Sequence, residues 1–258
     1  RRSRGLGDVY KRQKENFEKN PENFWEEKAK KFVWYKKWEE VLNWDFHAAK
    51  VEWFKGGKLN ISENCLDRHL KKNGDRTAIK WIANNPNEKN IDLSYKDLHL
   101  QVCKFSNVLK SKGINKGDRV CIYMPMVPEL AIAVLACARI GAIHSVVFAG
   151  FSAKSLSDRI NDATCKALIT SDGGFRGDKI TPLKSIADEA LRTTPSIEFC
   201  IVLERTKSTI DMNDIRDFWW HEEMKNVNID CTPEKMNSED ELFILYTSGS
   251  TGKPKGIV

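Results

Sequence analysis

The sequence predicts an α/β fold in which helices flank mostly parallel sheets. Between residues 76 and 203, apolar runs of strand length alternate with longer segments whose apolar residues recur at helical spacing. Parallel strands need crossover connections, and the intervening helices supply them. With 258 residues, of which 41% are hydrophobic, the chain has enough apolar content to bury a core.

Residues 1–13 precede this pattern and show no helical or strand periodicity. They are rich in arginine and begin without a methionine. We interpret them as a non-native or disordered leader and expect no regular structure there.

Residues 14–75 are expected to form an N-terminal helical region rich in aromatic side chains. Aromatic residues at helical spacing, including Trp34 and Trp38, predict one helix from Pro21 to Leu42, and a second is expected from Ser62 to Lys72. Interleaved aromatic and basic residues can also stack on nucleic acid. The glutamates among them favour a helix that packs on a domain.

The elements of residues 76–203 carry local start and stop signals. Ser94 with Asp97 three residues later is typical of a helix N-terminus, and Pro128 suits a first helical position. Gly113 and Gly141 are expected to end helices. The predicted strands are 78–83, 91–93, 119–124, 143–148, 167–170 and 199–203. Four helices are predicted: one that begins after Ser94, one over 129–140, one that contains Leu156 and Ile160, and one over 183–191.

The stretch from Leu242 to Gly256 carries the strongest chemical signal. An apolar run of strand length ends at Tyr246 and passes directly into hydroxyl residues, glycines and two lysines. Hydroxyls, lysines and the backbone N–H groups that glycine leaves accessible are suited to holding phosphate. Because the sequence ends two residues after Gly256, no following element is expected to support this loop.

Spacing separates this loop from two other phosphate motifs. A P-loop needs four residues between its glycines and a hydroxyl after its lysine, whereas Gly249 and Gly252 are two residues apart and Pro254 follows Lys253. The dinucleotide fingerprint needs a Gly-x-Gly, which the loop lacks. The remaining pattern, Thr247-Ser248-Gly249-Ser250-Thr251-Gly252-Lys253-Pro254-Lys255-Gly256, closely resembles the signature loop of the adenylate-forming superfamily, which contains acyl-CoA synthetases, luciferases and peptide-synthetase adenylation domains.

The resemblance covers about residues 21–258 and points to the AMP-forming acetyl-CoA synthetases in particular. It is carried by Trp53-Phe54, Gly57-Lys58-Leu59-Asn60, Asn64-Cys65-Leu66-Asp67-Arg68-His69, Tyr123-Met124-Pro125-Met126-Val127-Pro128-Glu129, Val147-Phe148-Ala149-Gly150-Phe151-Ser152 and Phe218-Trp219-Trp220-His221. It implies that residues 76–258 are the first, incomplete part of the AMP-binding domain.

Enzymes of this family join a carboxylate to CoA in two steps. The resemblance implies activation of acetate with ATP to acetyl-AMP and pyrophosphate, followed by acetyl transfer to CoA, with Mg²⁺ sharing the phosphate charge. Donors around the phosphates lower the repulsion between two reacting anions. The phosphate-binding residues it implies are Thr247, Ser248, Gly249, Ser250, Thr251, Gly252 and Lys253, whereas Lys255 is left open as a ligand or a solvated side chain.

A second group of residues is implied to bind the nucleotide end of CoA: Phe148, Ala149, Gly150, Arg176 and Lys179. Lys179 stands where these enzymes often have a second arginine, so it keeps the charge but not the bidentate geometry. From the residues alone, the Asp172–Lys179 segment could equally be a surface loop. His144 is interpreted as a structural histidine, and Asp67 to His69 as packing residues.

In this family, the acyl pocket, the residues that grip adenine and ribose, and the adenylation lysine all lie downstream of the signature loop. No catalytic residue is therefore assigned, and we expect these 258 residues alone to be inactive and to fold poorly. A propionyl-CoA synthetase or other short-chain acyl-CoA synthetase remains open, as does a non-catalytic module that binds a nucleotide or CoA.

Composition limits the other classes of function. Five basic residues and one acid within residues 1–13 account for four of the six net positive charges, so the rest of the chain does not require a nucleic-acid partner. No apolar run reaches the roughly 18 residues that span a bilayer. The seven scattered cysteines favour a reducing cytoplasm, and neither they nor the histidines show metal-site spacing. The expected partners are the small-molecule substrates, and the oligomeric state is left open.

Overall fold

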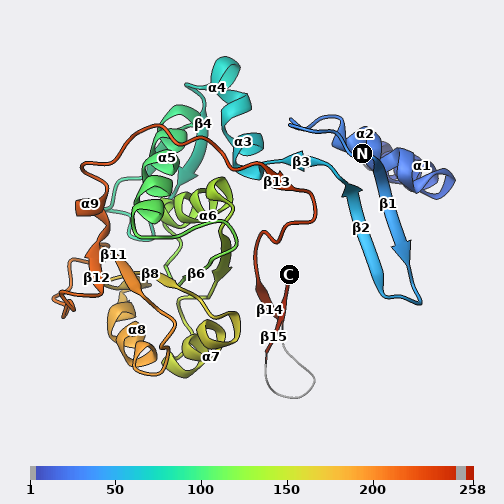
Figure 1. Cartoon of the computed structure of the whole chain (residues 1–258). Helices are drawn as coiled ribbons and strands as arrows, with labels where there is room; N and C mark the ends of the chain where they lie inside the picture. The colour runs from blue at the N-terminus through green and yellow to red at the C-terminus, as the bar shows by residue number, and fades with distance from the viewer. Residues whose placement is uncertain (1–3, 248–253) are drawn as a thin grey trace. The chain divides into compact units, whose positions relative to one another are not determined.

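The computed structural model describes residues 4–247 and 254–258. Its chain divides into two compact units, one comprising the residues up to Leu59 together with Lys235–Asp240, and the other comprising Asn60–Glu234 with Glu241–Val258 (Figure 1). The expected phosphate-binding residues Ser248, Gly249, Ser250, Thr251, Gly252 and Lys253 lie outside the described residues.

The first unit is built from two helices and two small antiparallel sheets. Strands β1 and β2 form a hairpin, and β3 pairs with β13. The elements are α1 (Arg4–Lys19), α2 (Pro21–Ala29), β1 (Glu40–Asp45), β2 (Lys50–Lys55), β3 (Lys58–Leu59) and β13 (Met236–Asn237). Helix α1 begins at Arg4, so the expectation of no regular structure was wrong for residues 4–13.

The predicted helix from Pro21 to Leu42 is also wrong beyond Ala29. The indole N–H of Trp34 donates to the Ala29 carbonyl at 2.9 Å, which occupies an acceptor that a longer helix would have used. The rings of Trp34 and Trp38 then lie 5.6 and 5.2 Å from the ring of Phe54 on β2. Aromatic packing against a distant strand therefore overrides the local helical spacing.

The second unit is organised around a five-stranded parallel sheet with the order β12-β11-β8-β6-β7. Helix α6 covers one face of the sheet and helices α7 and α8 cover the other (Figure 1). The α/β architecture expected from the sequence is confirmed. Its elements are α3 (Ile61–Cys65), α4 (Asp67–Asn73), β4 (Thr77–Trp81), β5 (Ile91–Ser94), α5 (Tyr95–Ser111), β6 (Arg119–Ile122), α6 (Pro128–Ile140), β7 (Ile143–Val146), α7 (Ala153–Ala163), β8 (Ala167–Ser171), β9 (Gly174–Arg176), β10 (Lys179–Thr181), α8 (Leu183–Leu191), β11 (Phe199–Leu203), β12 (Asp217–Trp219), α9 (Trp220–Glu223), β14 (Leu245–Thr247) and β15 (Lys255–Ile257).

The core of this unit has two apolar layers separated by the sheet. On β6, Val120 and Ile122 pack with the α5–α6 layer, whereas Cys121 packs with the α7–α8 layer, because side chains alternate along a strand. All seven cysteines are unpaired, and all except Cys65 are buried. The scattered cysteines of the sequence thus serve mainly as small core residues.

The predicted helix signals hold in this unit. Ser94 and Asp97 form a complete capping box at the start of α5, and Pro128 occupies the first turn of α6. Gly141 ends α6 at φ 73°, a left-handed conformation that favours glycine. The single helix expected over Ser62–Lys72 is instead two helices, because Leu66 leaves helical geometry at φ −121° and ψ −69°.

The chain returns to the sheet near its C-terminal end. The Ile244 N–H donates to the His144 carbonyl at 2.9 Å, so this segment extends the sheet beside β7. Strand β14 then pairs antiparallel with β15, which corrects the expectation that no element follows the loop. In the described ranges, no helix is long and apolar enough to cross a membrane.

Candidate functional site

A cavity of about 640 Å³ opens at the carboxyl edge of the parallel sheet. The chain leaves β6 through α6 toward β7, and then returns through α7 to β8 on the other side of β6. Loops that follow β6 and β8 therefore diverge to opposite faces and leave a crevice between them. This switch point is where open α/β sheets bind ligands.

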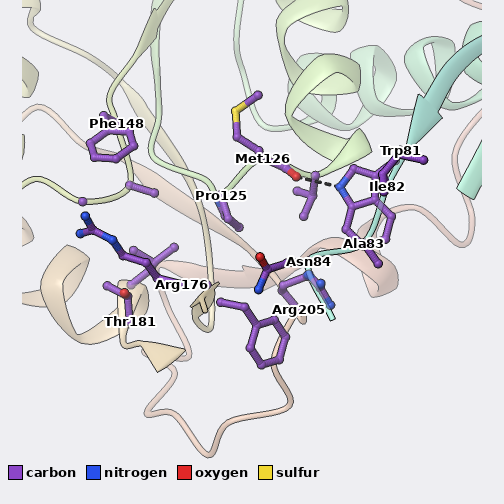
Figure 2. A pocket seen from close by; sticks show the side chains of 16 residues that line it. Trp81, Ile82, Ala83, Asn84, Pro125, Met126, Phe148, Arg176, Thr181 and Arg205 are labelled. Atoms are coloured by element: carbon purple, nitrogen blue, oxygen red, sulfur yellow. Dashed lines mark hydrogen bonds between the residues drawn. The ribbon is translucent and has the colours of Figure 1, made fainter. Parts of the chain in front are cut away.

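Segments from five parts of the unit line this cavity. They are the end of β4 with residues 82–84, residues 125–127 after β6, residues 148–150 after β7, the β9–β10 hairpin with the start of α8, and Arg205 after β11. Figure 2 shows Phe148 and Arg176 on one side, with Trp81, Ala83 and Asn84 across from them. The volume is within the range of typical small-molecule sites.

The CoA-binding segments expected from the sequence meet at this cavity. Phe148, Ala149 and Gly150 come from one loop and Arg176 from β9, and all four residues line the space. A Cβ at Gly150 would lie 2.4 Å from Cε1 of Phe148, so only glycine leaves that ring in place. Lys179 faces Arg176 across the hairpin register but is not among the lining residues, so its role stays a prediction.

Arg176 is the cation best placed to meet an anionic ligand here. It is exposed at the cavity, and within the described part of the chain its guanidinium has neither an ion pair nor a hydrogen bond. A guanidinium can bind a phosphate through two parallel hydrogen bonds. The cavity therefore combines an aromatic side chain, a close backbone approach at Gly150 and an available cation.

Arg205 is a second cation at the cavity, but its charge is already engaged. Its guanidinium makes two contacts of 2.8 Å with the Glu88 carboxylate. It also lies over the rings of Trp81 and Phe175, at 5.2 and 4.8 Å from their centroids. The Trp81 indole N–H in turn donates to the Met126 carbonyl at 2.8 Å (Figure 2). Arg205 therefore braces the wall of the cavity.

A buried carboxylate fixes the loop that carries Arg205. Asp172 is 1% exposed, and its two oxygens accept from the backbone N–H groups of Gly173, Arg205, Thr206 and Ser208 and from the Thr206 hydroxyl. Satisfied networks of this kind are rigid because each buried donor would be costly to leave unpaired. Asp172 thus sets the geometry of the cavity without lining it.

Sequence reasoning missed Trp81, Asn84, Met126, Thr181 and Arg205 as cavity residues. Trp81 and Asn84 belong to one segment at the end of β4, Met126 lies in a motif quoted for the resemblance but given no role, and Thr181 and Arg205 come from β10 and from the chain after β11. No single motif joins these five residues. The one available signal was position: Met126 and Arg205 follow predicted parallel strands, whose carboxyl ends meet at one edge.

Of the predicted phosphate loop, the structure describes only the residues at its two ends. Thr247 ends β14, and Lys255 and Gly256 lie in β15 opposite it. Both Thr247 and Lys255 are exposed. The assignment of Thr247, like that of the six residues outside the described ranges, stays a prediction.

Over residues 4–247 and 254–258, no three His, Cys, Asp or Glu side chains come together to hold a metal ion. We therefore assign no residue to Mg²⁺. His144 is 8% exposed, its backbone pairs with the chain before β14, and burial lowers its pKa to about 4. Its structural role stays a prediction.

Asp67 has a more specific role than the packing expected of it. Its carboxylate accepts two hydrogen bonds from the guanidinium of Arg139, at 2.8 and 2.9 Å, and lies 3.3 Å from Nε2 of His99. Burial alone would raise the pKa of Asp67, but hydrogen bonds from Arg139 and His99 hold it well below its usual range. The hydrogen bond to Asp67, followed by that to Cys103, raises the pKa of His99 to about 9. The cluster joins α4, α5 and α6 away from the cavity.

Comparisons with known proteins show which families this chain resembles. A sequence profile described as AMP-binding enzyme matches residues 66–258, and one described as acetyl-coenzyme A synthetase N-terminus matches residues 10–65.

Among curated relatives, an acetyl-coenzyme A synthetase of Bdellovibrio bacteriovorus is 53% identical over 96% of this chain and 39% of its own length. One from Rubrobacter xylanophilus is 56% identical over 92% of this chain and 36% of its own. A solved structure, acetoacetyl-CoA synthetase from Streptomyces lividans, matches with a TM-score of 0.84 and 25% identity, covering 93% of this chain and 36% of that one. The chain thus spans less than two fifths of the length of these relatives.

Proposed function

Because the chain belongs to the AMP-binding enzyme family and carries the acetyl-coenzyme A synthetase N-terminus, we propose that it is the N-terminal part of an acetate–CoA ligase. In the first step, a carboxylate oxygen of acetate attacks the α-phosphorus of ATP and pyrophosphate leaves. In the second, the CoA thiol loses its proton, its sulfur attacks the acetyl carbonyl carbon, and AMP leaves. Propionate or another short carboxylate would react in the same way.

The observation that carries this proposal is the convergence of the expected CoA segments on one cavity. Phe148 and Arg176 are 28 positions apart in the sequence, yet both line the same space at the sheet switch point, together with Ala149 and Gly150. The nucleotide end of CoA has an adenine ring for Phe148 and a 3′-phosphate for Arg176. Arg205, braced by Glu88, would hold the opposite wall in place.

ATP would be held through its β- and γ-phosphates by the loop between β14 and β15, where the hydroxyls, glycines and lysines concentrate. Mg²⁺ would accompany ATP and neutralise phosphate charge when bound. The residues of this chain would contribute donors that reduce the repulsion met by the incoming carboxylate.

Calorimetric titration of the 258-residue chain with CoA tests the cavity assignment. Arg176→Ala should weaken CoA binding by about tenfold, because a hydrogen-bonded charge pair contributes about 1.5 kcal/mol. The same variant should bind dephospho-CoA, which lacks the 3′-phosphate, as the unaltered chain does. Arg192→Ala, which removes an exposed arginine beside another cavity, is the matched control.

Equal CoA affinity in the unaltered chain and Arg176→Ala would refute this site. CoA binding without any response to ATP or pyrophosphate would instead favour a non-catalytic CoA-binding module. Lys179→Ala decides whether the second cation of the hairpin also meets CoA.

We place the reaction in the cytoplasm, since all seven cysteines are unpaired. We also propose that residues 14–75 form the N-terminal helical region and residues 76–258 the first part of the AMP-binding domain. The proposed partners are acetate, ATP and CoA, with neither nucleic acid nor membrane.

A further inference from the structure

Two cations line the candidate CoA cavity, and they differ in how far they are available to a ligand. Of the described residues that line this space, Arg176 and Arg205 carry a positive charge. Figure 2 shows Arg176 on the side of Phe148, whereas Arg205 lies on the side of Trp81. Arg176 is exposed, and within the described part of the chain its guanidinium has neither an ion pair nor a hydrogen bond.

The guanidinium of Arg205 is already occupied. Its two terminal nitrogens each lie 2.8 Å from an oxygen of the Glu88 carboxylate. Its Cζ also lies over the rings of Trp81 and Phe175, at 5.2 and 4.8 Å from their centroids. A phosphate that approached Arg205 would compete with Glu88 for the same N–H groups, because both anions prefer the two-bonded contact.

The attraction between these two side chains is stronger than that of an open surface pair. Arg205 is 15% exposed and Glu88 is 31% exposed at the side chain, so water screens their charges only in part. The pair carries no net charge. An anion in the cavity is therefore attracted to the Arg176 wall and not to the Arg205 wall.

The loop between β4 and β5 places Glu88 at this point. The Ala83 N–H donates to Oδ1 of Asn90 at 3.0 Å and ties the two ends of the loop together. The Glu88 N–H donates to the Asn85 carbonyl at 3.0 Å. Since the backbone is held by these bonds, little further ordering is needed to keep the carboxylate on Arg205.

We propose that Glu88 is a specificity-determining residue: it neutralises Arg205, so that the phosphate at the nucleotide end of CoA is bound by Arg176 on the opposite wall. This inference rests on the proposed function, because it assumes that the cavity takes the nucleotide end of CoA. With both guanidinium groups free, a phosphate could bind on either wall, and the ligand could lie in the cavity in two ways. Glu88 is not among the described lining residues and acts through Arg205.

The test titrates CoA calorimetrically into the 258-residue chain and its variants. Glu88→Gln keeps the shape of the side chain and one oxygen acceptor but removes the charge. In the Arg176→Ala background it should strengthen CoA binding about fivefold, because the released Arg205 can form a hydrogen bond to phosphate. Glu88→Gln alone should bind CoA at least as tightly as the unaltered chain does. If Glu88 only stabilised the wall, the double variant would instead bind CoA more weakly than Arg176→Ala.

Asp92→Asn is the matched control. Asp92 is an acid on the adjoining strand β5, and its carboxylate lies 3.9 Å from Nζ of Lys80. This variant removes the same charge at a site away from Arg205, so it should not restore CoA binding to Arg176→Ala. Equal recovery in both double variants would overturn the inference, since a change in net charge would then explain it.

Reaction with phenylglyoxal, which modifies accessible guanidinium groups, supplies a second readout that does not depend on CoA. Modification is located by mass spectrometry of peptides. In the unaltered chain Arg176 should react faster than Arg205. In Glu88→Gln the reaction of Arg205 should accelerate while that of Arg176 stays the same, and an unchanged rate at Arg205 would overturn the inference.

Failure of the inference and failure of the CoA site give different results. If the unaltered chain binds CoA no better than Arg176→Ala does, the CoA site itself is refuted, and the inference falls with it. If Arg176→Ala loses affinity and Glu88→Gln does not recover it, the inference alone is overturned and the CoA site stands.

Discussion

Asp172 offers the sharpest test of how the cavity is built. Its substitution by asparagine keeps the shape of the side chain but replaces one carboxylate oxygen with an amide NH₂. Oδ1 accepts from the N–H groups of Gly173, Arg205 and Thr206, and Oδ2 from Thr206 and Ser208. An NH₂ group at either position would face a donor.

The less costly orientation places the NH₂ group at the position of Oδ2. The Thr206 hydroxyl can then turn and accept, and Oδ1 keeps its three N–H donors, but the Ser208 N–H loses its acceptor. A buried unpaired N–H costs about 1–3 kcal/mol, and the remaining bonds lose their charge assistance. The expected loss in the free energy of unfolding for Asp172→Asn is therefore about 2–4 kcal/mol.

Urea denaturation followed by tryptophan fluorescence measures this loss. Asp178→Asn, an exposed acid in the β9–β10 turn, serves as the control and should change stability by less than about 0.5 kcal/mol. CoA affinity should also fall in Asp172→Asn, since the Arg205 wall is no longer fixed. A stability loss below about 0.5 kcal/mol would refute the argument that Asp172 organises this loop.

Two further predictions concern stability away from the cavity. The hydrogen bond to Asp67 raises the pKa of His99 from its ordinary 6.5 to about 9. The contribution of His99 to the free energy of unfolding should therefore be complete below pH 6.5 and lost as the pH rises toward 9. The difference in unfolding free energy between the unaltered chain and His99→Gln, measured from pH 6 to 10, should shrink over that window, and a constant difference would contradict it. The Trp220 ring stacks on Phe105 with centroids 3.8 Å apart, so Trp220→Ala should cost about 3–5 kcal/mol in urea denaturation. Trp219 is the half-buried neighbour of Trp220, and Trp219→Ala should lower the free energy of unfolding clearly less. Equal losses in the two variants would contradict the argument that the stack on Phe105 makes Trp220 important for stability.

The regular elements of the sheet were predictable because their signals are local. The bounds expected for residues 183–191 and 199–203 agree with α8 and β11, and the cap at Ser94 formed as the sequence indicated. Apolar periodicity and capping residues depend on neighbours in the chain, which the sequence displays directly.

Elements that depend on distant contacts were not predictable. Trp34 and Trp38 fit a helix by spacing, but their rings pack on Phe54 instead. The short strand β15 depends on pairing with β14, which no local pattern announces.

Some residues of the candidate site could be predicted from the sequence and others could not. Motif resemblance located Phe148 to Gly150 and Arg176, which the cavity brings together. Trp81 and Arg205 were not found because they come from the end of β4 and from the chain after β11, which only the fold brings to the same cavity. The Glu88 partner of Arg205 lies 117 residues away in sequence.

The exposure of the cysteine thiols makes their reactivity a measure of whether the chain is folded. Cys121 and Cys200 lie in the central strands at 0% exposure, whereas Cys65 is exposed at the end of α3. Burial raises the pKa of the Cys137 thiol to about 12, which further suppresses its reactive thiolate. A fluorescent maleimide can therefore mark the native protein at one defined position without mutagenesis. Access to the remaining thiols requires opening of the apolar layers, so their alkylation records how often the second unit opens.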